Sequence, residues 1–478
     1  MVCPHWRRVS ICTLSFSGTE QRKSQESGVL LFLYFVFFNI IFIFVPFKNR
    51  NNDKRHILHS PFRSVPLLVT SKIETMINAI FSTLPFGVCL FWSLLFLKEY
   101  RTADPAKRLL TGFMLVCTVL YFSHAVYFNK NSHLFSIIES IYAFCMLAVY
   151  PLYYLYICKL TEDTPLRIRH YWVLLPALIV SLTAALLYII MGDERISFVE
   201  SRFYGNTSLS ATFSSAAKAQ CYRLLFMKFL FALQLILVCY FGFKKLTHFN
   251  HRVKNFYANT EGKTLAPIRS LLTVFLIFAL LSSIANYIGR DFFIQKSWMV
   301  IIPSVIFTSM IFSVAYIGFR QKFTAIDFCR DEQMGKSKIM PAAPNAIDII
   351  DVHDDSLVVN DTEIPDSFLL GETICEIVES QQLFRKKGLL ITDVAKLTGS
   401  NRTYVSNYLN KELNTSFSDF INTYRVEYAK SLLTSKDPIY STFEIFEMSG
   451  FTNEVSFYRI FKKHTGLTPK QWNKQHGN

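Results

Sequence analysis

Long apolar runs recur between Met76 and Phe319, and they restrict the fold of this chain more than any other feature. Each run approaches the roughly 20 residues that a helix needs to cross the hydrocarbon core of a bilayer. A helix also satisfies its own backbone hydrogen bonds, which lipid cannot do for it. We therefore predict seven spanning helices, at about 77–97, 109–128, 134–158, 171–191, 222–242, 268–288 and 297–318.

Composition narrows the class of protein further. The chain of 478 residues is 51% hydrophobic with 46 Phe, which is too apolar for an ordinary soluble enzyme. Its formal net charge of +15 favours nucleic acid, anionic lipid or both as partners. The ten Cys are scattered, with no C-x-x-C pair and no Cys/His cluster at metal-ligand spacing. Because hydrolase, nucleotide-loop and zinc-protease motifs are also missing from the sequence, we expect no enzyme, no cofactor and no metal.

Basic residues alternate between the segments that join the apolar runs. They fill the segments after the first, third, fifth and seventh runs: Lys98, Arg101, Lys107, Arg108, Lys159, Arg167, Arg169, Lys244, Lys245, Arg252, Lys254, Lys263, Arg320, Lys322 and Arg330. Lys and Arg are retained on the cytoplasmic side of a membrane. The seven-span region, 76–320, is therefore predicted to begin outside the cell and to end in the cytoplasm.

The N-terminal extension, residues 1–75, does not fit this alternation. Its run VLLFLYFVFFNIIFIFVP, at 29–46, is barely long enough to span. An eighth span would place Lys48, Arg50, Lys54, Arg55, Arg63 and Lys72 outside. Two interpretations remain. Either translation begins at Met76, or the extension is a weak extra hydrophobic anchor.

Polar and acidic sequence follows the last run. Residues from about 330 to 368 are rich in Asp and contain Pro341, Pro344 and Pro365, a composition typical of a self-repelling tether. We predict an acidic flexible linker over 321–367 and a helical domain over 368–478. The expected fold class is all-α: a polytopic transmembrane bundle followed by a cytoplasmic all-helical domain.

The C-terminal region contains an internal repeat with an offset of about 51 residues. ITDVAKLTGSNRTYVSNYLNKELNTSFSDFIN aligns with TFEIFEMSGFTNEVSFYRIFKKHTGLTPKQWN. Each copy predicts a short helix, a turn at Gly399 or Gly450, and a longer helix that ends at Asn414 or Gly466. A capped helix follows at once, with Thr468 at the N-cap and Gln471 at the capping-box position. We interpret each copy as a helix-turn-helix unit.

The second helix of such a unit lies in the DNA major groove, with one face packed on the domain. We expect Tyr404, Val405, Leu409, Phe457, Ile460 and Phe461 to face inward. The predicted DNA-facing residues are Arg402, Thr403, Ser406, Asn407, Lys411, Glu454, Val455, Tyr458, Arg459 and Lys462. Arg459 and Lys462 suit phosphate or guanine, Asn407 suits adenine and Glu454 suits cytosine. A helix containing Phe420, Ile421, Tyr424, Ala429 and Leu432 is predicted to join the copies.

These residues resemble the DNA-binding domain of the AraC/XylS family of bacterial transcription regulators. The resemblance covers about 370–475 and rests on Gly450-Phe451, on F-x-R-x-F-K-K from Phe457, and on G-x-T-P from Gly466. It implies that one monomer places two helices in successive major-groove segments. The chain departs from the family pattern at Phe446, where Ala is usual, and at Asn473, where Arg is usual. The bulk of Phe446 must be accommodated by repacking.

Polar residues within the predicted spans are functional candidates. His124, Glu139, Lys228 and Asn286 lie a turn or two inside the outer face of the predicted topology. They could form a ligand-binding membrane cluster, Glu139 could pair with Lys228, or the side chains could simply snorkel.

Together these patterns predict a multi-pass protein of the bacterial inner membrane whose cytoplasmic domain binds double-stranded DNA and regulates transcription. An unknown small molecule or protein would supply the stimulus, and RNA polymerase would be a partner of an activator. A homodimer is left open. Two alternatives are a transporter or channel with an appended DNA-binding domain, and an anchored regulator that proteolysis releases.

Overall fold

The computed structural model describes residues 67–204, 213–288, 298–337, 367–435 and 440–476. Within these residues every regular element is a helix, and one isolated antiparallel bridge joins Tyr257 and Leu390. The all-α fold class is thus confirmed. The chain divides into two compact units. We call the described parts of Arg22–Leu246 and Ala266–Gln321 the bundle, and those of Thr247–Leu265 and Lys322–Asn478 the C-terminal unit.

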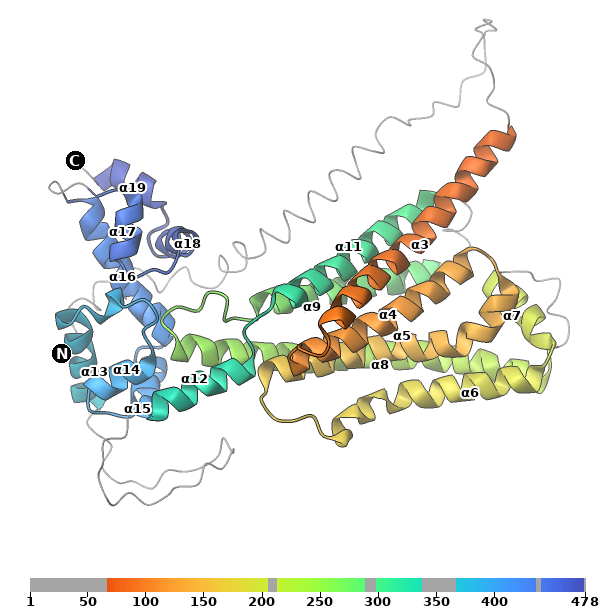
Figure 1. The fold of residues 1–478 in the computed structure, drawn as a ribbon, viewed down its shortest axis with the longest axis horizontal. Coiled ribbons are helices and arrows are strands. Elements are labelled where there is room, and N and C mark those ends of the chain that lie inside the picture. The colour runs from red at the N-terminus through yellow and green to blue at the C-terminus, as the bar shows by residue number, and fades with distance from the viewer. Residues whose placement is uncertain (1–66, 205–212, 289–297, 338–366, 436–439, 477–478) are drawn as a thin grey trace, which may run out of the picture. The chain divides into compact units, whose positions relative to one another are not determined.

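The bundle is built from long helices that lie side by side (Figure 1). They are α3 (Leu67–Glu99), α4 (Pro105–Phe128), α5 (Ser132–Thr161), η1 (Ile168–Leu174), α6 (Leu175–Met191), α7 (Glu194–Tyr204), α8 (Ser215–Phe256), α9 (Ala266–Ile288) and α11 (Trp298–Arg320). Helix α3 packs between α4 and α11, and α5 packs between α4 and α6. The last residues of α8 belong to the C-terminal unit.

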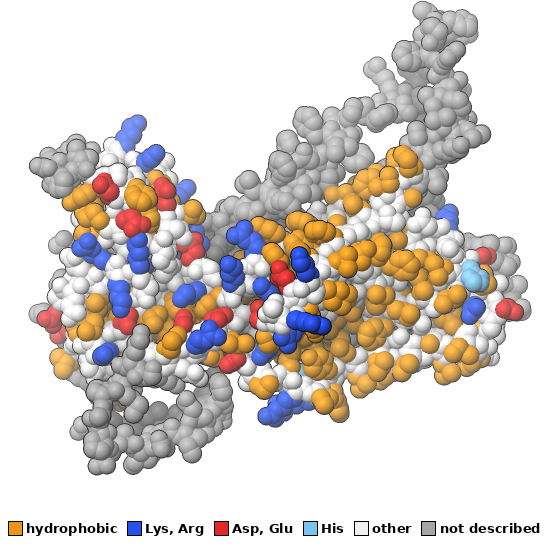
Figure 2. Space-filling model, viewed as in Figure 1, with side chains coloured by type: hydrophobic (Ala, Val, Ile, Leu, Met, Phe, Trp, Pro, Cys, Tyr) orange, Lys and Arg blue, Asp and Glu red, His pale blue; other side chains and the backbone are white. Residues whose placement is uncertain are grey.

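Apolar side chains cover much of the outer surface of the bundle, as Figure 2 shows for one face. Leu182, Ile189 and Phe229 are 61%, 75% and 64% exposed. In water such a surface would be costly, whereas in lipid it is solvated. Within the described residues, six helices are long and apolar enough to cross a membrane: Ala79–Glu99, Pro105–Phe128, Ser132–Thr161, Ile168–Met191, Ser215–Phe256 and Ile301–Gly335.

The seventh expected span, at 268–288, lies in α9. The part of this helix with described side chains, Ala266–Ile277, is apolar but shorter than a span. A count of seven therefore stays a prediction. Residues 1–66 lie outside the described residues, and α3 begins at Leu67, before Met76. Both interpretations of the N-terminal extension also stay predictions.

The linker expected over 321–367 is not irregular throughout. Helix α12 occupies Ala325–Ser337, and residues 338–366 lie outside the described residues. Phe328 is fully buried against the rings of Phe249 and Phe256, which lie at the end of α8. Because one buried aromatic side chain anchors α12, the expectation of a flexible tether is wrong for residues 325–337.

The rest of the C-terminal unit consists of short helices (Figure 1). They are α13 (Ser367–Ser380), η3 (Leu383–Arg385), α14 (Ile391–Leu397), α15 (Arg402–Asn407), η4 (Tyr408–Glu412), α16 (Phe417–Leu433), α17 (Thr442–Met448), α18 (Glu454–Thr465) and α19 (Pro469–His476). The predicted joining helix is α16, which buries Phe420, Ile421 and Ala429 completely. Leu433 rather than Leu432 completes this buried stripe.

Candidate nucleic-acid interface

The second helix-turn-helix copy consists of α17, a turn at Gly450 and α18. Gly450 has φ +78°, and a Cβ there would lie 2.6 Å from the backbone oxygen of Arg385, so the turn requires glycine. Asn453 caps α18, because its side chain accepts a hydrogen bond from Ser456 N at 2.8 Å. Gly466 ends α18 at φ +78°, as predicted for a left-handed cap.

Helix α18 has one buried and one exposed face. Phe457 and Phe461 are fully buried, and Ile460 packs against the same cluster while half-buried. Four of the five predicted DNA-facing residues are exposed, namely Glu454, Val455, Arg459 and Lys462. The fifth, Tyr458, is half-buried, and its side chain also packs against the cluster. One carboxylate, one apolar side chain and two cations therefore share the solvent face.

The first copy consists of α14, a turn at Gly399, and α15 continued by η4. Gly399 has φ +64°, and Asn414 ends the copy at φ +47°, both as the repeat predicted. The single longer helix that we expected is instead one α-helical turn and a half followed by a π turn. Within that π turn, Leu413 N donates to Tyr408 O at 3.2 Å.

The faces of the first copy largely match the expectation. Val405 and Leu409 are buried, whereas Tyr404 is only half-buried. The predicted DNA-facing residues divide by exposure: Thr403, Asn407 and Lys411 are exposed, and Arg402 and Ser406 are half-buried. This copy thus offers mainly neutral hydrogen-bonding groups. We refer to α15 with η4, and to α18, as the reading helices.

Helix α16 joins the segment just before the first copy to the second copy through Arg425, which sequence patterns did not single out. Its guanidinium lies 5.6 Å from the ring centroid of Phe451, which follows the turn glycine of the second copy. The guanidinium is 1% exposed, and Nε donates to Phe384 O at 2.7 Å. Nη1 donates to Asn422 Oδ1 at 3.3 Å and Nη2 to Lys386 O at 3.2 Å. Burial lowers the pKa of Arg425 to about 10, so it stays charged at neutral pH. The sequence of an amphipathic helix does not distinguish a buried Arg from an exposed one, so this role was not predicted.

A second connection joins α16 to α18. Lys463 Nζ donates to Asp419 Oδ1 at 2.8 Å. Burial alone would raise the pKa of the Asp419 carboxyl, but Lys463 and the Ser416 hydroxyl hold the pKa below its ordinary value. The carboxylate form is therefore favoured in the folded unit, and it positions the C-terminal half of a reading helix.

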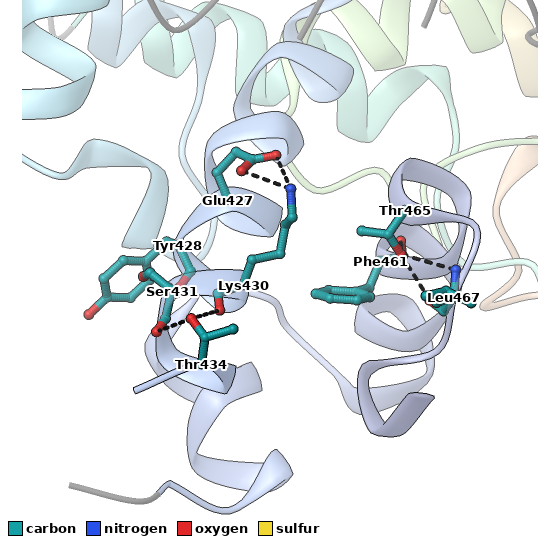
Figure 3. Close-up of polar contacts among 8 residues, drawn as sticks. All are labelled: Glu427, Tyr428, Lys430, Ser431, Thr434, Phe461, Thr465 and Leu467. Atoms are coloured by element: carbon teal, nitrogen blue, oxygen red, sulfur yellow. Dashed lines mark hydrogen bonds and ion pairs between the residues drawn. The ribbon is translucent and has the colours of Figure 1, made fainter. Parts of the chain in front are cut away.

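Local side-chain contacts fix the ends of both helices near this connection (Figure 3). Lys430 Nζ bonds both oxygens of Glu427, at 2.9 and 3.0 Å. Thr465 Oγ1 donates to Phe461 O at 2.9 Å and accepts from Leu467 N at 3.2 Å. The predicted capping box at α19 is also confirmed, since Gln471 N donates to Thr468 Oγ1 and Thr468 N donates to Gln471 Oε1.

Both departures from the family pattern are accommodated without loss of the motif. Phe446 is 5% exposed in the cluster that also buries Phe457 and Phe461, and its ring meets Phe443 edge-on. Asn473 lies exposed on α19 and takes no part in that cluster. The larger side chain at 446 thus adds apolar contact to the core.

The expected membrane cluster is only partly brought together. Glu139 is fully buried, but its partner is Arg223, whose Nη2 lies 2.6 Å from Oε1. Lys228 is exposed on α8, so the Glu139–Lys228 pair is wrong. His124 lies against the ring of Tyr142. The side chain of Asn286 lies outside the described residues, and a ligand role for the cluster stays a prediction.

Comparison with known proteins supports the interpretation of the repeat. Residues 394–475 match a family model described as a helix-turn-helix domain. An uncharacterized HTH-type transcriptional regulator of Staphylococcus aureus (strain MSSA476) is 28% identical over 120 residues, 25% of this chain and 14% of that protein. The uncharacterized HTH-type transcriptional regulator YtdP of Bacillus subtilis (strain 168) is 33% identical over 87 residues, 18% of this chain and 11% of that protein.

These matches cover a small part of each relative, and no solved structure matches the chain. The family model bears on residues 394–475 alone. That region is an AraC-type helix-turn-helix domain, as the resemblance implied.

Proposed function

We propose that this chain is a membrane-embedded transcription regulator that binds promoter DNA sequence-specifically through both reading helices. The observation that carries the proposal is the exposed face of α18. Arg459 and Lys462 lie on this face, and the opposite face of the capped helix is packed in the core. Their charges suit phosphate or guanine, and the carboxylate of Glu454 can accept from cytosine. Both relatives are named as HTH-type transcriptional regulators, which agrees with this role.

The two copies would share the recognition of DNA unequally. Thr403 and Asn407 present neutral donors and acceptors, and Asn407 suits a bidentate bond to adenine. Arg459 and Lys462 would supply most of the charge that displaces counterions from the duplex. Arg425 and the Asp419–Lys463 pair would keep the copies at a fixed spacing, which two successive major-groove segments require.

The apolar bundle would hold this domain at the inner face of the membrane. Its outward-facing aliphatic and aromatic side chains match a lipid environment. The alternation of basic segments favours a cytoplasmic C-terminal unit. An envelope or membrane signal would act by changing the packing of the bundle, and the buried Glu139–Arg223 pair is one place where such a change could begin.

Selection of DNA by the purified full chain in bilayer nanodiscs tests the proposal. Random duplexes of about 40 base pairs are long enough to hold two successive major-groove segments. Selection should recover a preferred sequence, and Arg459→Ala should weaken binding to it by about 1–3 kcal/mol if Arg459 reads a base. Lys474→Ala, an exposed change of the same charge on α19, serves as the control. Recovery of no preferred sequence would contradict sequence-specific binding.

A further inference from the structure

Two segments of the C-terminal unit lie against the starts of both reading helices. We call them the connector: Thr247–Leu265, which contains the end of α8 and the loop after it, and α12. Phe256, Tyr257 and Ala258 at its centre are at most 2% exposed. The connector is therefore a packed part of this unit. It carries one acidic side chain to Arg402, which is predicted to face DNA, and another to Asn453, the N-cap residue of α18.

Hydrogen bonds fix the backbone of the connector on the domain just before the first copy and at the start of α16. Ala258 N donates to Leu389 O at 3.0 Å, next to the bridge between Tyr257 and Leu390. Ser418 Oγ, at the start of α16, donates to Ala258 O at 3.0 Å. These bonds hold the loop in place independently of any charged side chain.

The first acidic contact involves Arg402, the first residue of α15. Its guanidinium forms an ion pair with the carboxylate of Glu332 on α12 and lies 5.2 Å from the ring centroid of Phe256. Arg252 of the connector approaches the same carboxylate at 3.4 Å. Arg402 is half-buried by these contacts. A residue predicted to bind DNA is thus already engaged by an anion of the same chain.

The second acidic contact involves the start of α18. The side-chain amide of Asn453, the N-cap residue, donates to the carboxylate of Glu261. Beside it, the amide of Asn259 donates to the hydroxyl of Thr452. The loop after α8 therefore contacts the second reading helix just before its first turn, as α12 contacts the first.

DNA and the connector need the same surface. In a helix-turn-helix unit the N-terminal residues of the second helix contact base edges, close to the phosphates. Glu332 and Glu261 place two carboxylates at these positions, where a duplex would bring its own negative charges. Like charges that must also lose water repel one another strongly. The connector and the duplex therefore cannot occupy the two helix starts together.

We propose that the connector is an intramolecular competitor of DNA. In a closed state Glu261 and Glu332 occupy the starts of both reading helices, and DNA binding requires the connector to leave. This inference rests on the proposed function. The equilibrium between the closed and the DNA-bound state is the bistable element on which a signal can act. The connector would thus regulate DNA binding in addition to supporting the fold of the domain.

Helix α8 gives a path for the signal. It is unbroken over 42 residues, Ser215–Phe256, which at 1.5 Å per residue is about 63 Å, twice the thickness of a hydrocarbon core. The same helix carries Arg223, the partner of the buried Glu139, and ends in the connector at Phe256. A rotation or shift of α8 in the bundle would act directly on the segment that covers the reading helices.

Neutralising the two acids tests the proposal in the full chain in nanodiscs, with the duplex recovered by selection. The double variant Glu261→Gln with Glu332→Gln should bind DNA about fivefold more tightly or better, the lower end of ordinary coupling between sites. The matched control is Glu376→Gln with Glu379→Gln, which makes the same change in net charge at exposed positions of α13. Equal affinity of the two double variants, or weaker binding by the connector variant, would overturn the proposal.

Cross-linking gives a second measurement with a different readout. In a Glu261→Cys, Asn453→Cys chain, a short bifunctional maleimide should join the two positions, because the Ala258–Leu389 bond keeps the loop docked. The cross-linked protein should lose DNA binding, and saturating DNA added first should suppress the cross-link. A cross-linked protein that binds DNA normally refutes the competition and leaves the proposed function intact. Failure of the unmodified chain to bind any duplex refutes both.

Discussion

The two helix-turn-helix copies share a turn glycine, a left-handed end and a buried stripe, yet they differ in what they expose. The first has a short reading helix with a π turn and mainly neutral groups. The second has a regular helix of 12 residues with Arg459 and Lys462 on its face. The two copies therefore have the same turn, helix end and buried face but different exposed residues. The comparison indicates that hydrogen-bond readout and charge are divided between the copies.

The largest expected effect comes from Arg425→Met, because this side chain holds the segment before the first copy and also packs on Phe451 of the second. The change leaves the carbonyl oxygens of Phe384 and Lys386 without their donor in a buried site. Charged hydrogen bonds of this kind contribute about 1.5–3 kcal/mol each, so a loss of about 3 kcal/mol or more is expected. Native-state hydrogen exchange of the C-terminal unit measures it.

Lys470→Met, at an exposed position of α19, is the control for Arg425→Met. It should leave protection from exchange unchanged. If Arg425→Met destabilised only the second copy, the two copies would not form one cooperative unit. The spacing between the reading helices would then not be fixed.

Substituting the two turn glycines gives a second comparison between the copies, with a smaller expected loss of stability. Gly399→Ala meets open space and suffers only the positive φ, at about 1–2 kcal/mol. Gly450→Ala has the same strain and also brings Cβ within 2.6 Å of two backbone oxygens, so its loss of stability should be roughly twice as large. Hydrogen exchange of α15 and α18 compares them. Equal losses would show that the turns are packed alike.

A pH-dependent effect is expected in the second copy alone. Burial lowers the pKa of His464 to about 4, from an ordinary value of 6.5. Its charged neighbours are Lys463, Asp419, Glu427 and Lys430. Because the folded state resists protonation, stability should be complete above pH 6.5 and should fall as pH drops toward 4, by on the order of 1 kcal/mol per unit.

His464→Gln tests the origin of that pH dependence. Hydrogen exchange of α18 should lose most of its dependence in this window, and the remaining loss near pH 4 and below would come from Asp419, whose pKa is held below its ordinary value. An unchanged profile would mean that His464 is solvated in the folded unit.

Sequence patterns predicted those features that depend on neighbouring residues. The turn glycines, the cap at Thr468, and the buried faces of the reading helices follow from local sterics and from 3.6-residue periodicity. The resemblance to a known family then supplied the arrangement of the two copies.

Features that depend on distant partners were missed. Helix α12 has the composition of a solvated linker, but the partners of Phe328 and Glu332 come from segments about 70 to 80 residues away, before and after it. Glu139 was expected to meet Lys228 and instead meets Arg223. These two residues of α8 lie about 140° apart around the helix axis, so only packing can decide between them.

A hydroxyl-radical footprint of the full chain in nanodiscs on its selected duplex tests the central claim most directly. Two reading helices on one monomer predict two protected segments in successive major grooves, about 10 base pairs apart. Arg459→Ala should weaken the protection of one segment, and Asn407→Ala that of the other. A single protected segment, affected by only one of these changes, would contradict an account in which both copies read DNA.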